Sequence, residues 1–188
     1  MKKRIIIVRH GETDGNIQDR VQTPETPLNS LGEQQIQELA HSLLENNEFV
    51  QIISSDHARA IKSAQILSES LNIPHSEINS LLNERNAGLM RDMYHTEIFE
   101  KYPEVVSIND KGEKFIDITK RPPEGESWDD LLLRAEKIVE YAQTLDSNTI
   151  LVAHGGIIRA ILSHIHNVPN FEDNYKQFKV DNASFFEL

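Results

Sequence analysis

A short apolar run near the start of the chain constrains the fold more than any other segment. Ile5-Ile6-Ile7-Val8 is a series of β-branched residues without polar alternation, which is typical of a strand buried on both faces. The run ends abruptly at Arg9, His10 and Gly11. Ligands of open α/β sheets bind just beyond the carboxyl ends of such strands. The sequence therefore predicts a buried strand with a functional site at its end.

The same pattern returns late in the chain. Thr149 to Ala153 is a second apolar run, which ends in His154-Gly155-Gly156 and leads into apolar residues at helical spacing. If the two strands are parallel neighbours, His10 and His154 lie at the same edge of the sheet.

Strand and helix patterns alternate between these two runs, which predicts a single α/β domain over residues 1–188 with a mainly parallel sheet. Helices are expected to begin at Asn29 or Ser30 (with a capping box from Ser30 to Glu33), at Ser55 or Asp56, and after Ser127. Further strands are expected at 50–54 and, more weakly, at 78–82, and residues 178–188 are expected to form a closing strand or hairpin.

Two segments carry no clear period. Residues 11–28 are polar and rich in turn formers, which indicates a loop over the site. Residues 83–126 are the least periodic part, with one short helix expected near Tyr94 to Tyr102. We interpret this second segment as a cap inserted beside the site, because long irregular connections in compact domains are usually functional.

Composition excludes several classes of function. A formal net charge of −11 argues against a nucleic-acid binder, although a few cations in one cleft still suit a small anionic substrate. The absence of cysteine excludes a thiolate nucleophile and cysteine-ligated zinc, and the histidines show no metal-ligand spacing. After the basic start Met1-Lys2-Lys3-Arg4 only four apolar residues precede Arg9, so we expect a cytoplasmic protein that does not bind membranes.

The predicted sheet edge gathers groups suited to phosphate chemistry. Arg59 follows the strand at 50–54 and should reach the same edge as Arg9, His10 and His154. Arginine bonds two phosphate oxygens at once, and nearby helix amino termini offer backbone N–H groups. Without cysteine, neutral His10 is the candidate nucleophile. Glu84 is the candidate acid for the leaving group, provided that burial or the incoming phosphate keeps a proton on it.

These residues resemble the histidine phosphatase superfamily, in its phosphoglycerate mutase-like branch, over nearly the whole chain. Five blocks in the right order carry the resemblance: Arg9-His10-Gly11-Glu12-Thr13 with Asn16, Ser54 to Ala64, Leu82 to Gly88, Gly125 to Arg134, and Val152 to Gly156. Pro27 to Gln35 resembles the stretch that opens the first helix.

The resemblance implies a three-layer α/β/α fold and a reaction through a phosphohistidine on His10, without metal or cofactor. Arg9, Arg59 and His154 would hold the phosphoryl oxygens, and Glu84 would protonate the leaving group before activating water. The remaining expected phosphate or substrate contacts are Asn16, Gly11, Thr13, Gln22, Arg85 and Gly155.

Three functions follow from this resemblance. The first is a metal-independent phosphatase acting on a small phosphorylated metabolite. The second is a 2,3-bisphosphoglycerate-dependent phosphoglycerate mutase, which is disfavoured because Asn86-Ala87 and a short cap replace the histidine-tyrosine pair and longer cap of such mutases. The third is a non-catalytic phosphate-binding module, against which the complete catalytic set argues. The sequence assigns neither the substrate nor an oligomeric state.

Two departures from the family pattern concern the pocket lining rather than the chemistry. Arg91 stands where a second glycine is common, and His57 stands where a leucine is frequent. One further hypothesis is a second anionic subsite, formed by Arg85, Arg91, Lys120 and Arg121.

Overall fold

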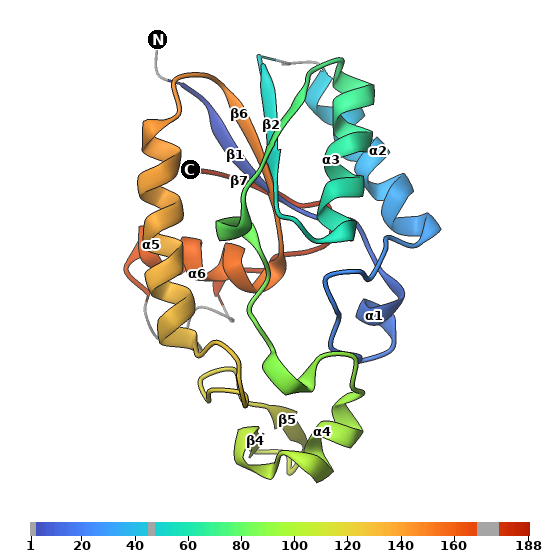
Figure 1. The fold of residues 1–188 in the computed structure, drawn as a ribbon, viewed down its shortest axis with the longest axis vertical. Coiled ribbons are helices and arrows are strands. Elements are labelled where there is room, and N and C mark those ends of the chain that lie inside the picture. The colour runs from blue at the N-terminus through green and yellow to red at the C-terminus, as the bar shows by residue number, and fades with distance from the viewer. Residues whose placement is uncertain (1–2, 45–47, 169–176) are drawn as a thin grey trace.

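A five-stranded sheet forms the centre of the molecule (Figure 1). In spatial order its strands are β3 (His75–Ile78), β2 (Gln51–Ser54), β6 (Thr149–Ala153), β1 (Ile5–Arg9) and β7 (Phe185–Glu187). The first four are parallel, and β7 runs antiparallel to β1. This computed structural model describes residues 3–44, 48–168 and 177–188, so Met1 and Lys2 of the basic start lie outside the described residues.

Helices cover both faces of the sheet and give the three layers seen in Figure 1. The even residues Ile6 and Val8 of β1 pack with α2 (Ser30–Leu44) and α3 (Ala58–Leu71). The odd residues Ile5 and Ile7 pack with α5 (Trp128–Thr144) and α6 (Gly155–His166). The mainly parallel α/β fold is therefore confirmed, and the unbroken apolar run reflects a strand covered on both sides.

The two strands that end in histidine are parallel neighbours, as predicted. In the β1–β6 register, Arg9 lies opposite Ala153, so His10 and His154 leave the sheet at the same level. Strand β6 also pairs with β2, with Ser54 opposite Val152. The carboxyl ends of three adjacent strands therefore lie side by side, which brings the start of α3 to the same edge.

Helix α5 begins as the sequence indicates, whereas the cap of α2 differs. Ser127 and Asp130 form a reciprocal capping box at the start of α5. At α2 the side chain of Asn29 accepts a hydrogen bond from the backbone N–H of Gly32 (2.8 Å), so Asn29 is the cap and the expected Ser30 box is wrong. The side-chain oxygen of Asn29, one residue before Ser30, already accepts from one of the unpaired backbone N–H groups at the start of the helix.

Helix α3 begins later than expected, at Ala58. Its N-cap position is His57, which makes no side-chain cap bond. Ser55 was an expected cap, but its hydroxyl donates to Asn83 Oδ1 (2.9 Å) and contacts His154 Nε2 (2.7 Å). The site therefore uses the hydroxyl that the helix pattern had assigned to capping.

The remaining corrections concern short elements. The weak strand expected at 78–82 lies earlier, as β3, and is followed by the 3₁₀ turn η1 (Ser80–Leu82). Strand β3 is a largely exposed edge strand, so it lacks the apolar pattern that would locate it. Residues 11–28 are not all loop, because α1 (Asp14–Ile17) forms there behind a Thr13–Asn16 capping box.

The cap extends beyond the carboxyl edge of the sheet, at the lower end of Figure 1. It consists of η2 (Gly88–Met90), α4 (His95–Lys101), η3 (Pro103–Val105), and a hairpin of β4 (Val106–Ile108) and β5 (Lys114–Ile116). Helix α4 is the predicted short helix, and the hairpin was not predicted because its three-residue strands are too short to show a period. Met90, Ile98 and Val105 give the cap a small core of its own.

Within the described part of the chain, no helix has both the length and the apolar character needed to span a lipid bilayer.

Candidate active site

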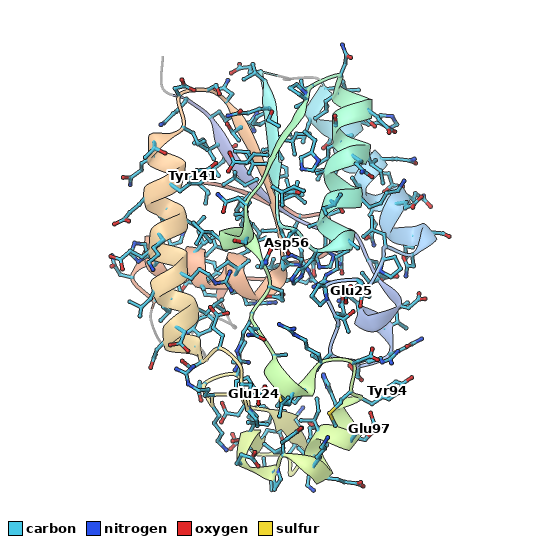
Figure 2. The ribbon with its side chains drawn as sticks, viewed as in Figure 1. Glu25, Asp56, Tyr94, Glu97, Glu124 and Tyr141 are labelled. Carbon is cyan, nitrogen blue, oxygen red and sulfur yellow. The ribbon has the colours of Figure 1, made fainter. Side chains whose placement is uncertain are left out.

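A cavity of about 690 Å³ lies between the carboxyl edge of the sheet and the cap. In Figure 2 the labelled Asp56 and Glu25 lie on the sheet side, and Glu124, Tyr94 and Glu97 lie in the cap. Most of the predicted site residues line this cavity, namely Arg9, His10, Asn16, Gln22, Arg59, Glu84 and Arg85. The topology thus brings together residues that are up to 76 positions apart in the chain.

His10 is held in place by a hydrogen-bond partner at each ring nitrogen. Its Nδ1 lies 2.6 Å from the carbonyl oxygen of Gly11, which can only accept, so Nδ1 carries the proton. Its Nε2 accepts a hydrogen bond from Arg59 Nε at 3.2 Å. Burial, reinforced by the charges of Arg59 and Arg9, lowers the pKa of His10 well below its ordinary value. His10 is therefore a neutral imidazole with an oriented lone pair on Nε2.

Arg59 is almost fully buried, with 2% of its surface exposed, in the first turn of α3. Besides His10, its guanidinium donates to the carbonyl of Thr23 (2.8 Å) and contacts His57 Nδ1 (3.2 Å). Burial lowers the pKa of Arg59 to about 10, so the group remains cationic at neutral pH. A buried guanidinium beside a neutral imidazole is suited to hold an anion at that point.

His154 lies beside His10, and the hydroxyl of Ser55 determines which ring nitrogen of His154 carries the proton. The ring centroids of His10 and His154 are 5.0 Å apart. Ser55 Oγ donates to Asn83 Oδ1 (2.9 Å), so it must accept from His154 Nε2 (2.7 Å). His154 Nδ1 then bears a lone pair, and it is buried without a hydrogen-bond partner among the described residues. Burial and the charge of Arg59 lower the pKa of His154 well below its ordinary value.

His57 adds a third imidazole to this cluster. Its ring centroid lies 4.7 Å from that of His154. Burial, together with the charge of Arg59, lowers the pKa of His57 to about 4. The three imidazoles are therefore neutral at pH 7, and the positive charge of the pocket comes from arginine.

Glu84 lies at the amino end of α6. Its Oε2 accepts a hydrogen bond from the backbone N–H of Gly156 (3.1 Å), and its Oε1 accepts one from that of Arg85 (2.8 Å). A Cβ added at Gly156 would lie 2.3 Å from Glu84 Oε1, so the carboxyl group occupies the space that this glycine leaves. The carboxyl group therefore has a fixed position on one wall of the cavity.

Arg9 and Asn16 complete the wall nearest β1. Arg9 Nη1 donates to the carbonyl of Val180 (2.7 Å). A Cβ at Gly155 would lie 3.3 Å from Arg159 Nη1 and 3.4 Å from Arg9 Nε, so Gly155 packs closely against both guanidinium groups. Within the described chain the side-chain hydrogen bonds of Asn16 fall on Oδ1, with partners at Thr13 and Asn182, which leaves Nδ2 for a ligand.

The other predicted contacts divide into two groups. Gln22 lines the cavity, and its Oε1 is buried without a partner in the described residues. Arg85 lines it too, but its guanidinium donates to the carbonyls of Glu126 (2.7 Å) and Lys120 (2.8 Å). Gly11 and Thr13 do not line the cavity: the structure places Gly11 against the first turn of α2 and Thr13 at the start of α1.

Sequence reasoning missed several residues that support the site. Ser55 and Asn83 orient His154, and Ser55 directly follows β2 just as His10 follows β1, so the same positional rule would have found it. Arg134 was not assigned a role. It pairs with Glu126 (2.7 Å) and donates to the carbonyls of Leu81 (2.7 Å) and Asn83 (2.6 Å), which anchors the segment that presents Glu84.

The cavity is cationic although the chain is acidic. Seven arginines and three carboxylates line it, whereas the whole chain has a formal net charge of −11. A cluster of one sign in a cleft focuses the field and favours an anionic ligand. Among the described residues, no group of three or more histidine, aspartate or glutamate side chains is arranged to hold a metal ion.

Comparison with known proteins gives a family and several relatives. The sequence model described as "Histidine phosphatase superfamily (branch 1)" matches residues 5–188. A metal-independent phosphoserine phosphatase of Arabidopsis thaliana is 33% identical over 164 residues, covering 86% of this chain and 68% of that protein. A 6-phosphofructo-2-kinase/fructose-2,6-bisphosphatase of Gallus gallus is 29% identical over 86% of this chain, which spans only 32% of that protein's length.

A solved structure agrees with this assignment. The mycobacterial glucosyl-3-phosphoglycerate phosphatase, in complex with VO3, superposes with a TM-score of 0.76 and 27% identity. The match covers 99% of this chain and 90% of the other.

Proposed function

This chain belongs to branch 1 of the histidine phosphatase superfamily, and from that premise we propose that it hydrolyses a small phosphorylated metabolite through a phosphohistidine on His10. Its relatives include phosphatases with different substrates, among them phosphoserine and glucosyl-3-phosphoglycerate by their names. The phosphomonoester group is what these substrates share. The proposal is therefore a phosphomonoesterase whose particular substrate depends on the cap.

One observation carries the proposal: the imidazole of His10 is neutral and holds its Nε2 lone pair against Arg59. The Nδ1–H donates to the carbonyl of Gly11 (2.6 Å), so the lone pair available for attack belongs to Nε2. The contact from Arg59 Nε to that nitrogen (3.2 Å) marks where an entering phosphoryl group would meet both the nucleophile and a cation. This arrangement is the one required for attack on a phosphate that carries negative charge.

In the first step, the Nε2 lone pair of His10 forms a bond to phosphorus and the ester P–O bond breaks. The electron pair of that bond goes to the leaving oxygen, which takes a proton from Glu84. Arg9, Arg59 and the Nδ1 side of His154 hold the phosphoryl oxygens, with Asn16 Nδ2 as a further donor. Since His154 Nδ1 bears a lone pair in the free site, its role as a donor requires that it takes up a proton when the anion arrives.

In the second step, water attacks the phosphorus and the P–N bond breaks. Glu84, now a carboxylate, takes a proton from the water, and the electron pair of the P–N bond returns to Nε2. Inorganic phosphate is the product, and both side chains regain their starting state. Glu84 suits both tasks because backbone N–H groups of Arg85 and Gly156 hold its two oxygens in place.

The experiment is turnover of p-nitrophenyl phosphate combined with trapping of labelled phosphate on the protein. We expect the wild-type chain to release phosphate and to retain acid-labile, base-stable label, as a phosphohistidine does. His10→Ala should lose both. His41→Ala, in an exposed histidine of α2, is the matched control and should retain both. Full activity in His10→Ala, or turnover without any trapped label, contradicts the proposal.

Mutase activity is the alternative outcome of a second assay. With 3-phosphoglycerate and catalytic 2,3-bisphosphoglycerate, a phosphatase releases inorganic phosphate, and a mutase forms 2-phosphoglycerate. We expect phosphate release, because the short cap leaves the phosphoenzyme accessible to water. Isomerisation that exceeds phosphate release would assign the chain to the mutases.

A further inference from the structure

The wall of the cavity beyond Glu84 carries a guanidinium that the proposed chemistry does not use. Arg91 follows η2, lines the cavity and is exposed. Its backbone is extended (φ −58, ψ 141), and the left-handed φ of 68 falls on Asp92, so the conformation of Arg91 does not require a glycine. The arginine side chain is therefore accommodated without backbone strain.

The other cations of this wall bind carboxylates or backbone carbonyls of the protein. Arg121 pairs with Asp130 (2.5 Å), and Arg134 pairs with Glu126 (2.7 Å). Arg85 donates to two backbone carbonyls, and Lys120, from the same expected subsite, donates to the carbonyl of Val106 (2.8 Å). These groups support the cap rather than await a ligand.

Arg91 differs from them. In the described chain its hydrogen bond is to the neutral amide oxygen of Asn86 (2.8 Å), and no carboxylate lies within ion-pair distance. Its charge also acts on His57 beside the phosphoryl pocket and on exposed Glu25 across the cavity. Arg91 thus places a positive charge in the cavity, and no carboxylate among the described residues neutralises that charge by direct contact.

The position of this charge relative to the reaction indicates what it binds. The transferred phosphoryl group lies at His10 and Arg59, and the ester oxygen faces Glu84 in the proposed mechanism. The rest of the substrate must therefore extend past Glu84. Asn86, which holds Arg91, is two residues beyond Glu84, so Arg91 lies on the leaving-group side of the cavity.

We propose that the natural substrate carries a second anionic group, a carboxylate or a second phosphate, on its leaving-group portion, and that Arg91 binds it. This inference rests on the phosphatase activity proposed above. A planar guanidinium bonds two oxygens of either anion. Phosphomonoesters of the same size with an uncharged leaving-group portion lack this contact and are poorer substrates.

The test compares three substrates with one carbon skeleton: glycerol 3-phosphate, 3-phosphoglycerate and glycerol 1,3-bisphosphate. They differ only in whether the far carbon belongs to a hydroxymethyl, a carboxylate or a phosphorylated hydroxymethyl group. We expect the wild-type chain to favour at least one anionic substrate over glycerol 3-phosphate by about tenfold or more in kcat/KM, the size of one charge-assisted hydrogen bond. Which of the two it favours distinguishes a carboxylate from a phosphate.

Arg91→Ala should remove most of that preference by raising KM for the anionic substrate, while kcat/KM for glycerol 3-phosphate stays within about twofold. Arg4→Ala is the matched control, because it removes the same charge at the opposite, amino end of β1 and should retain the preference. Arg91→Lys should restore part of it. A wild-type chain with no preference overturns this inference, and so does an equal loss on all three substrates in Arg91→Ala.

Failure of the underlying phosphatase activity is recognised separately. If neither these substrates nor p-nitrophenyl phosphate is hydrolysed, the proposed function itself is wrong. If p-nitrophenyl phosphate is hydrolysed and Arg91→Ala leaves the substrate preference unchanged, only the second anionic subsite is wrong.

Discussion

The three neutral imidazoles of the site predict that acid destabilises the fold in a pH range where carboxylates do not yet titrate. His10, His57 and His154 are buried or largely buried, and the pKa of each is lowered, that of His57 to about 4. In the unfolded chain a histidine has a pKa of about 6.5. Between these values the unfolded state binds protons that the folded state does not, so stability falls as pH falls.

The size of the effect follows from the same difference. At pH 5.5 an unfolded histidine is about ten times more often protonated than neutral. Each such histidine therefore raises the equilibrium constant for unfolding about tenfold between pH 7.5 and pH 5.5. Three such histidines, each neutral in the folded state, set an upper bound of about a 1,000-fold shift, or about 4 kcal/mol less stability at pH 5.5 than at pH 7.5. The lowered pKa of His75 acts in the same direction.

Urea unfolding followed by tryptophan fluorescence measures this difference, because the single tryptophan, Trp128, is buried in the core with 4% of its surface exposed. The buffers must be free of phosphate, which would bind the folded site. His57→Asn keeps an acceptor for Arg59 and removes one titrating group. In this variant the change in the unfolding equilibrium constant between pH 7.5 and pH 5.5 should therefore be about tenfold smaller than in the wild type.

Stability between pH 7.5 and 8.5 is the internal control and should stay level, since these histidines are then neutral in both states. A wild-type chain as stable at pH 5.5 as at pH 7.5, or more stable, would refute the reasoning. It would mean that the imidazoles are protonated in the folded protein, which is incompatible with a free lone pair on His10.

Three substitutions test the packing around the site. Gly156→Ala places a Cβ 2.3 Å from Glu84 Oε1, so the flexible carboxylate must move. We expect kcat to fall at least tenfold for alkyl phosphates and by less for p-nitrophenyl phosphate, whereas the melting temperature should not change. Gly11→Ala puts a Cβ 2.2 Å from the backbone oxygen of Gly32, and should cost more than about 2 kcal/mol in urea unfolding. Ser127→Ala removes the cap of α5 and should cost about 1 kcal/mol, or about 2–4 °C in melting temperature, with kcat unchanged. Equal melting temperatures for the Gly11 variant and the wild type, or a Ser127 variant inactive while folded, would contradict these assignments.

Gly11 illustrates how one residue of a motif can serve the fold as well as the site. Next to His10, a glycine suggests close approach of a ligand. The structure shows that the group that comes close is the first turn of α2, where Gly32 lies against Gly11 and Glu12. The motif therefore joins two elements of the fold as well as presenting His10, the proposed nucleophile.

The sequence by itself determined the strands that carry the histidines and the helices that cover them. Ile5 to Val8 and Thr149 to Ala153 form continuous, mostly apolar runs because both faces of those strands are buried, and such a run is visible in the local sequence. The edge strand β3 and the cap hairpin bury few side chains, so no period marks them. Their positions depend on pairing with distant segments.

Only the tertiary structure decided which polar groups meet. Ser55 serves His154 instead of capping α3, because Asn83 and His154 reach its hydroxyl from segments 28 and 99 residues away. The candidate cations Arg85, Lys120 and Arg121 are engaged by backbone carbonyls or a carboxylate of the protein, whereas among the described residues the Arg91 guanidinium donates only to the neutral amide oxygen of Asn86. Residue type gives each group its chemistry, whereas hydrogen-bond partners are fixed by distances of a few ångströms that arise only when the chain has folded.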